Sequence, residues 1–208
     1  MSAKFQLNNF KVPKITLRRF DIINLLKEHG VLSRRQINQL VFNESDYGIW
    51  KCRVELKTLH DARLIQRGKC MSVNDYVYWV GKSPGQLDHR LGVNDIWLTV
   101  RDKVNIFVKE YDFGMGVADA YCVVEDRPYF VEYQRYVSKD ICDKVTKYEQ
   151  YALSKRWDTK DWPMPGKFAR VIVVVDDERD KVRYAKVIKS DTVKFVVCLK
   201  ESVKDVIK

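Results

Sequence analysis

Several signatures that would identify a function at once are absent from this 208-residue sequence. There is no Walker loop, no glycine-rich phosphate cradle and no His-x-His cluster, so an ATPase, a helicase or a relaxase is not expected. The five cysteines are scattered and include no Cys-x-x-Cys pair, which argues against a disulfide framework and a zinc site. No apolar run approaches the roughly 18–20 residues that span a bilayer, and the first residues lack the apolar core of a signal peptide. We therefore expect a cytoplasmic protein with no membrane partner.

Positive charge is in excess, and it is concentrated in the first part of the chain. The formal net charge is +10, and residues 1–82 carry 15 Lys/Arg against 7 Asp/Glu, whereas residues 83–208 carry 23 against 21. Clustered basic charge indicates a polyanionic partner, because each neutralised phosphate releases condensed counterions. A membrane surface is the competing polyanion, but no long basic amphipathic helix is available to dock there. DNA is the expected partner.

Residues 1–82 contain the signals of three helices and a β-hairpin. Thr16 can cap a first helix that runs to about Glu28, and Ser33-Arg34-Arg35-Gln36 has the form of a capping box that opens a second helix. A third helix is expected from about Asp46 to Ala62, and the turn residues Asn74-Asp75 lie within the hairpin that follows. This order predicts a winged helix-turn-helix DNA-binding domain.

In such a domain the third helix enters the major groove and the hairpin contacts the DNA backbone. The expected DNA-binding residues are the basic side chains on these elements and at the start of the second helix: Arg34, Arg35, Lys51, Arg53, Lys57, Arg67 and Lys69. A basic face that is merely solvated is the alternative interpretation, since many winged helices bind only protein. The segment after the third helix resembles the end of a recognition helix in winged-helix regulators, except that Arg63 stands where those commonly have Gly.

A second domain is expected over residues 83–208, because Ser83-Pro84-Gly85 has the composition of a turn or linker between domains. A helix is predicted over about 86–103, and it is followed by strands 105–111, 117–124 and 128–134, helix 138–156, strand 169–175, helix 178–189 and strand 193–199. The continuous apolar run at 171–175 is typical of a strand that is covered on both faces. The fold class is therefore mixed α/β, with an αβββαβ sandwich after the winged helix.

Two acids lie within apolar strand sequences of this second domain. Asp119 falls on the second expected strand and Glu132 on the third, and strand alternation puts Glu132 and Gln134 on one face. Together these groups can converge on one divalent metal ion and its water, and Asp95 is a further candidate metal ligand. The same acids can instead face solvent from a sheet edge. A metal site here would hold Mg²⁺ or Mn²⁺, and otherwise no cofactor is expected.

This arrangement resembles the PD-(D/E)XK nuclease superfamily. The resemblance implies that Asp119 and Glu132 match the two acids that bind magnesium, and that Gln134 occupies the position of the lysine. The catalytic lysine is thus replaced, and Lys144 on the following helix is the candidate for a displaced charge. Whether the domain is an enzyme is left open by this substitution.

The combined layout also resembles the replication-relaxation family of plasmid and phage proteins, which join a winged helix to a nuclease-like domain. The resemblance rests on the order of "LDHRLGVNDIWL" (87–98), "GVADAYCVV" (116–124), "YFVEYQRYVS" (129–138) and the pair formed by Lys144 and Tyr148. That family usually has Glu-x-Asp-Arg in the third-strand motif, so Gln134 departs from it and Arg135 fits.

Three functions remain open at this point. The first is a DNA-binding factor for replication, relaxation or copy control of a mobile element, whose expected partners are DNA, a second copy of the chain, and the element's replication or transfer proteins. The second is a metal-dependent endonuclease in which Asp119 and Glu132 bind magnesium and Gln134 orients the water. The third is a transcriptional repressor whose C-terminal domain is only a scaffold.

Overall fold

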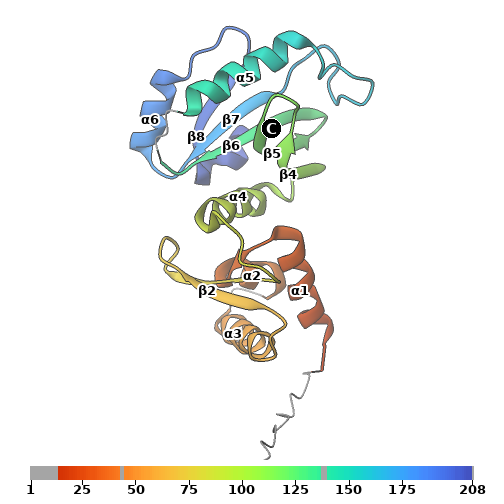
Figure 1. Ribbon diagram of the computed structural model, residues 1–208, viewed down its shortest axis with the longest axis vertical. Helices are drawn as coiled ribbons and strands as arrows, with labels where there is room; N and C mark the ends of the chain where they lie inside the picture. The colour runs from red at the N-terminus through yellow and green to blue at the C-terminus, as the bar shows by residue number, and fades with distance from the viewer. Residues whose placement is uncertain (1–13, 43–44, 137–139, 208) are drawn as a thin grey trace, which may run out of the picture. The chain divides into compact units, whose positions relative to one another are not determined.

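The computed structural model describes residues 14–42, 45–136 and 140–207. The chain divides into two compact units, Met1–Leu91 and Gly92–Lys208, here called unit 1 and unit 2. The division falls inside a helix, α4 (Leu87–Val100), whereas the sequence led us to expect it after residue 82. Each unit contains its own β-sheet together with helices, so the mixed α/β class is confirmed (Figure 1).

Unit 1 has three helices and a small antiparallel sheet. In chain order the elements are α1 (Leu17–His29), β1 (Leu32–Ser33), α2 (Arg34–Val41), α3 (Asp46–Asp61), β2 (Gln66–Cys70) and β3 (Asp75–Trp79). The two-residue strand β1 pairs with β3, and β3 pairs with β2, so the hairpin gains a third strand that the sequence did not reveal.

The helices of unit 1 begin where the capping signals predicted. The Thr16 hydroxyl accepts a hydrogen bond from the Arg19 backbone N–H at 3.3 Å. At the start of α2 the capping box is complete, because Ser33 Oγ accepts from the Gln36 N–H at 3.2 Å and Gln36 Oε1 accepts from the Ser33 N–H at 2.9 Å. These bonds satisfy backbone donors that have no partner inside the helix, which fixes where each helix starts.

The position of α3 is set by apolar packing and by one enclosed ion pair. Leu56 and Leu59 are fully buried against the other two helices. Beside them, Arg19 Nε on α1 lies 2.6 Å from Glu55 Oε2 on α3. The chain leaves α3 through Arg63, whose φ of 60° lies in the left-handed region that normally favours Gly. The turn after the third helix is therefore left-handed although no Gly is present, at a cost of about 1–2 kcal/mol for a residue with a side chain.

Unit 2 is built on one five-stranded sheet. Beyond α4 its elements are β4 (Ile106–Asp112), β5 (Val117–Val124), β6 (Arg127–Gln134), α5 (Asp140–Ser154), β7 (Arg170–Val175), α6 (Glu178–Val187), β8 (Phe195–Leu199), η1 (Lys200–Ser202) and α7 (Val203–Val206). The strand order is β4-β5-β6-β7-β8. The β4–β5 and β5–β6 pairs are antiparallel, whereas the β6–β7 and β7–β8 pairs are parallel.

Helices cover both faces of this sheet. Residues of α4 and α7 pack with Tyr133 and Val131 of β6, while residues of α5 pack with Phe130 on the other face (Figure 1). A Cβ on Gly92 would lie 1.9 Å from the Tyr133 ring, so α4 approaches the sheet closely only because this residue is glycine. Among residues 14–42, 45–136 and 140–207, no helix combines the length and apolar character needed to cross a bilayer.

Candidate functional site

The two strand acids lie next to each other where β5 and β6 stop pairing. The β5–β6 ladder includes Ala120 opposite Val131, and one step further along the same register Asp119 faces Glu132. There a side chain replaces the backbone acceptor of the ladder, because Asp119 Oδ2 accepts a hydrogen bond from the Tyr133 backbone N–H at 2.7 Å. Opposed residues of antiparallel strands point to the same face, so both carboxylates lie on the face that α5 covers.

Helix α5 supplies two partners to Glu132, which is only 1% exposed. Tyr148 Oη donates a hydrogen bond to Glu132 Oε1 at 2.5 Å, and the Lys144 ammonium donates to Glu132 Oε2. Lys144 Nζ also lies 3.9 Å from Asp119 Oδ1. Since Lys144 and Tyr148 are four residues apart, they share one face of the helix. The ammonium group is thus shared between the two acids.

Burial and charge shift the titration of all three groups around this cluster. Burial raises the pKa of Glu132 to about 7, the Asp119 charge adds to the rise, and Lys144 and the Tyr148 hydrogen bond oppose it. Burial alone lowers the pKa of Lys144, but the charges of Glu132 and Asp119 outweigh it, so its pKa is raised. Burial, followed by the Glu132 charge, raises the pKa of Tyr148 well above its usual range. At neutral pH Lys144 is therefore charged and Glu132 is close to its titration point.

Gln134, which stands where the nuclease resemblance puts the lysine, can now be compared with Lys144. Gln134 is the last residue of β6, is half-buried, and lies on the Glu132 face by strand alternation. It is Lys144, however, that brings an ammonium group to the acids. Tyr148 was named only as the partner of Lys144 in the family resemblance and not as a site residue, and the signal that points to it is its four-residue spacing from Lys144.

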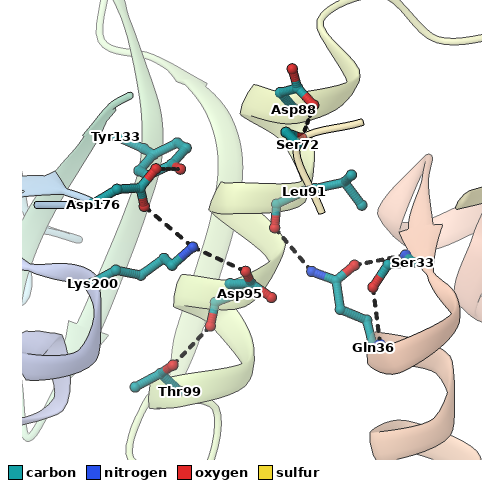
Figure 2. Close-up of polar contacts among 10 residues, drawn as sticks. All are labelled: Ser33, Gln36, Ser72, Asp88, Leu91, Asp95, Thr99, Tyr133, Asp176 and Lys200. Carbon is teal, nitrogen blue, oxygen red and sulfur yellow. Dashed lines mark hydrogen bonds and ion pairs between the residues drawn. The ribbon is translucent and has the colours of Figure 1, made fainter. Parts of the chain in front are cut away.

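Asp95 does not join this cluster. It lies on α4, which packs against the opposite face of the sheet, and its Oδ2 is 3.2 Å from Lys200 Nζ (Figure 2). Lys200 also lies 3.3 Å from Asp176, whose carboxylate accepts a hydrogen bond from the Tyr133 hydroxyl at 2.6 Å (Figure 2). Within the part of the chain that the structure describes, no three His, Cys, Asp or Glu side chains form a group that could hold a metal. Asp95 lies on the opposite face of the sheet from Asp119 and Glu132.

The carboxylates of Asp119 and Glu132 are suitable ligands for a magnesium ion, but in this structure they contact other side chains. Carboxylate oxygens are the ligands that Mg²⁺ prefers, and Asp119 and Glu132 would be the residues to hold it. In this structure both oxygens of Glu132 already accept hydrogen bonds, and the Lys144 ammonium lies close to both acids. A metal ion at this cluster would therefore share the Glu132 oxygens with their α5 partners, and the Lys144 charge beside both acids would oppose its binding.

The expected DNA-binding residues of α3 differ in how they are held. Arg53 and Lys57 are exposed, and Lys57 Nζ lies 2.6 Å from Asp61 on the next turn. Lys51 is half-buried and its Nζ is 3.8 Å from Glu55, the acid that also binds Arg19. Lys51 is thus drawn toward the α1–α3 contact, while Arg53 and Lys57 are presented to solvent.

Two of the expected DNA-binding cations on α2 and the hairpin contact other side chains of unit 1. Arg34 Nη2 lies 2.7 Å from Asp75 Oδ1, which ties the start of α2 to β3. The Arg67 guanidinium lies 5.2 Å from the centre of the Tyr76 ring, in a cation–π contact across the hairpin. Arg35 and Lys69 are exposed. Arg34 and Arg67 therefore stabilise unit 1 as well as adding positive charge to it.

Two exposed aromatic side chains on α3 were not expected to contribute to the site. Tyr47 is 67% and Trp50 is 54% exposed, and their ring centroids are 5.9 Å apart. Val54, one turn after Trp50, is also exposed. Their spacing of three to four residues places them on one face of the helix. The outer face of α3 is thus apolar as well as basic.

Comparisons with known proteins assign no family. No family model and no curated protein sequence match the chain. Among solved structures, the chain is similar to protein VC1899 from Vibrio cholerae, known from a crystal structure, at 15% sequence identity and a TM-score of 0.34. The match covers 90% of this chain and 48% of VC1899, so the chain spans about half the length of that protein.

Proposed function

We propose that unit 1 is a winged helix that binds duplex DNA, with α3 in the major groove and the β2–β3 hairpin against the backbone. The support is the order of elements, in which α1, β1, α2, α3 and a hairpin follow one another as in that class of domain. The short strand β1 completes the sheet of the hairpin.

The observation that carries this proposal is the exposure of Arg53 and Lys57 on α3, with Lys69 exposed on the hairpin. Within the described residues, no carboxylate forms an ion pair with Arg53 or Lys69, so their charge is available to phosphates. The surrounding chain adds to the attraction, because residues 1–82 have a net charge of +8. Each phosphate that is neutralised releases counterions and so favours binding.

The biological setting we propose is the replication, relaxation or copy control of a plasmid, phage or other mobile element, in the cytoplasm. Its support is the resemblance of the sequence motifs to the replication-relaxation family. In this proposal unit 2 contributes a dimer contact or a second DNA contact. A repressor is the competing role, and footprinting on the element's own origin and promoter distinguishes the two by which site is protected.

The test of DNA binding compares Arg53→Ala, Lys57→Ala and the double variant with a matched control, Lys186→Ala, which removes an exposed cation from α6 in unit 2. Fluorescence anisotropy with a labelled duplex gives the dissociation constant of each. We expect each substitution on α3 to weaken binding by about tenfold, since a hydrogen bond to a charged group contributes about 1.5–3 kcal/mol. The control should bind like the unaltered protein. Equal binding by all four variants and the unaltered protein contradicts the proposal.

A second candidate function, metal-dependent cleavage of DNA, is favoured by one specific observation. Asp119, Glu132 and Lys144 bring two acids and an ammonium group together, the charge pattern that the nuclease resemblance implies. When bound, Mg²⁺ or Mn²⁺ would supply an activated water, and Lys144 would sit beside the reacting phosphate as a fixed positive charge.

The test incubates the protein with supercoiled, single-stranded and branched DNA in the presence of Mg²⁺ or Mn²⁺. Asp119→Asn, which preserves the acceptor for the Tyr133 N–H, should abolish cleavage while circular dichroism stays unchanged. No cleavage of any substrate, or cleavage that persists in Asp119→Asn, excludes the endonuclease.

A further inference from the structure

Unit 2 contains a second candidate site, far from the acid cluster along the sheet. A pocket of about 190 Å³ lies where β6 and β7 begin, and it is lined by Arg127, Tyr129, Met164, Lys167, Phe168 and Arg170, among others. The register explains the convergence, because β6 and β7 run parallel and Tyr129 lies opposite Arg170. Along β6 the lining residues Arg127 to Tyr129 lie three to five residues before Glu132, a distance of about 10–17 Å at about 3.3 Å per residue.

The charges around the pocket have one sign. Arg127 comes from the start of β6, Lys167 from the loop that leads into β7 and Arg170 from β7 itself, and no Asp or Glu among the described residues lines the pocket. Lys167 and Arg170 form no ion pair with any residue that the structure describes. The positive charges of Lys167 and Arg170 repel one another, so their arrangement is most favourable when an anion is bound.

The wall of the pocket is apolar and firmly supported. Phe168 is half-buried and stacks on Trp162 with an interplanar angle of 15°. Trp157 and Tyr151 pack against it edge-on, with ring centroids 5.4 and 5.8 Å away. The Trp157 and Trp162 side chains are in turn anchored by hydrogen bonds from their indole N–H groups to the carbonyls of Ala152 and Lys167. The ring is therefore held in place as a rigid surface beside three cations.

We propose that this pocket binds a phosphate group of a nucleotide or of a nucleic-acid strand, with the adjoining sugar or base against Phe168. Three cations complement the double negative charge of a phosphomonoester, and an aromatic wall suits the apolar faces of a nucleoside. The volume limits the ligand, because pockets for whole drug-sized molecules measure about 300–1,000 Å³. The pocket thus takes one phosphate and the group next to it. This site is independent of DNA binding by unit 1.

The experiment uses isothermal titration of the full chain with inorganic phosphate, thymidine 5′-monophosphate, thymidine and a short single-stranded oligothymidylate. All titrations use the Arg53→Ala/Lys57→Ala background, so that DNA binding by α3 does not mask the pocket. The variants are Lys167→Gln and Arg170→Gln, and the matched control is Lys194→Gln, an exposed lysine just before β8 that does not line the pocket. Lys167 is exposed in a loop, so its substitution tests the pocket even if Arg170→Gln fails to fold.

We expect thymidine 5′-monophosphate to bind, thymidine to bind at least about tenfold more weakly, and each pocket variant to lose about tenfold in affinity relative to the control. Tighter binding of the oligonucleotide than of the monophosphate identifies a strand as the ligand, and the reverse order identifies a free nucleotide. The proposal is overturned if no phosphate compound binds at millimolar concentration, or if both pocket variants bind like Lys194→Gln.

Discussion

Replacing Glu132 by glutamine should change how the stability of the protein depends on pH. The Glu132 carboxyl group is enclosed by Lys144 and Tyr148, and its pKa is raised from 4.5 to about 7, mainly by burial. A group whose pKa is higher in the folded than in the unfolded state stabilises the protein at low pH, and this contribution is lost as the pH rises through the folded-state pKa. The glutamine side chain has nearly the same shape as glutamate and does not ionise.

The magnitude follows from the two pKa values. One pKa unit corresponds to about 1.4 kcal/mol, so between about pH 5 and pH 8 the unaltered protein should lose about 2–3 kcal/mol relative to Glu132→Gln. Lys144 is charged throughout this range and cancels in the comparison. In Glu132→Gln, Lys144 has one acid fewer beside it. This changes the difference in free energy of unfolding between the two proteins by a constant amount, but it does not change how that difference varies with pH.

Urea denaturation at each pH, followed by circular dichroism, gives the free energy of unfolding of both proteins. Glu201→Gln, which alters an exposed carboxyl group in η1, is the control and should follow the unaltered protein at every pH. Parallel stability profiles for Glu132→Gln and the unaltered protein would refute the assignment of Glu132 as a buried group with a raised pKa. An unaltered protein that gains stability relative to the variant as the pH rises would refute it as well.

Three further substitutions test the packing and the surface. Gly92→Ala should destabilise unit 2 by about 1–3 kcal/mol in urea denaturation, because the new Cβ collides with the Tyr133 ring, whereas Gly85→Ala, which enters open space, should leave stability nearly unchanged. Glu55→Ala should cost about 2–3 kcal/mol, since it leaves the enclosed Arg19 charge unpaired; a loss below about 0.5 kcal/mol would contradict this role. Trp50→Ala should weaken DNA binding by at least about fivefold with an unchanged melting temperature, and a matching drop in both would mean that Trp50 is structural.

The helices of unit 1 could be predicted because their start signals are local. The side chains of Thr16 and Ser33 bond to backbone groups three residues away, so the sequence alone contains both partners. The strands of unit 2 could be predicted for a similar reason, since continuous or alternating apolar runs are visible in the sequence. The contact of Lys144 with the acids could also be predicted, because the helix that follows the third strand must return across the sheet.

Features that depend on distant contacts could not be predicted. The division between the units falls after Leu91, because that residue is buried with the hairpin of unit 1, which no local pattern reveals. Asp95 was expected beside Asp119, but its place follows from the close approach of α4 at Gly92 and from its ion pair with Lys200. The basic pocket likewise forms only when β6 and β7 align.

The central claim is that α3 brings unit 1 to DNA through its exposed cations. The most direct test is the salt dependence of duplex binding, measured for the unaltered protein and for the Arg53→Ala/Lys57→Ala variant. We expect the logarithm of the binding constant to fall linearly with the logarithm of the salt concentration, with a slope that is shallower in the variant by about 0.9 for each lost phosphate contact. Identical slopes and affinities for the two proteins would contradict the claim.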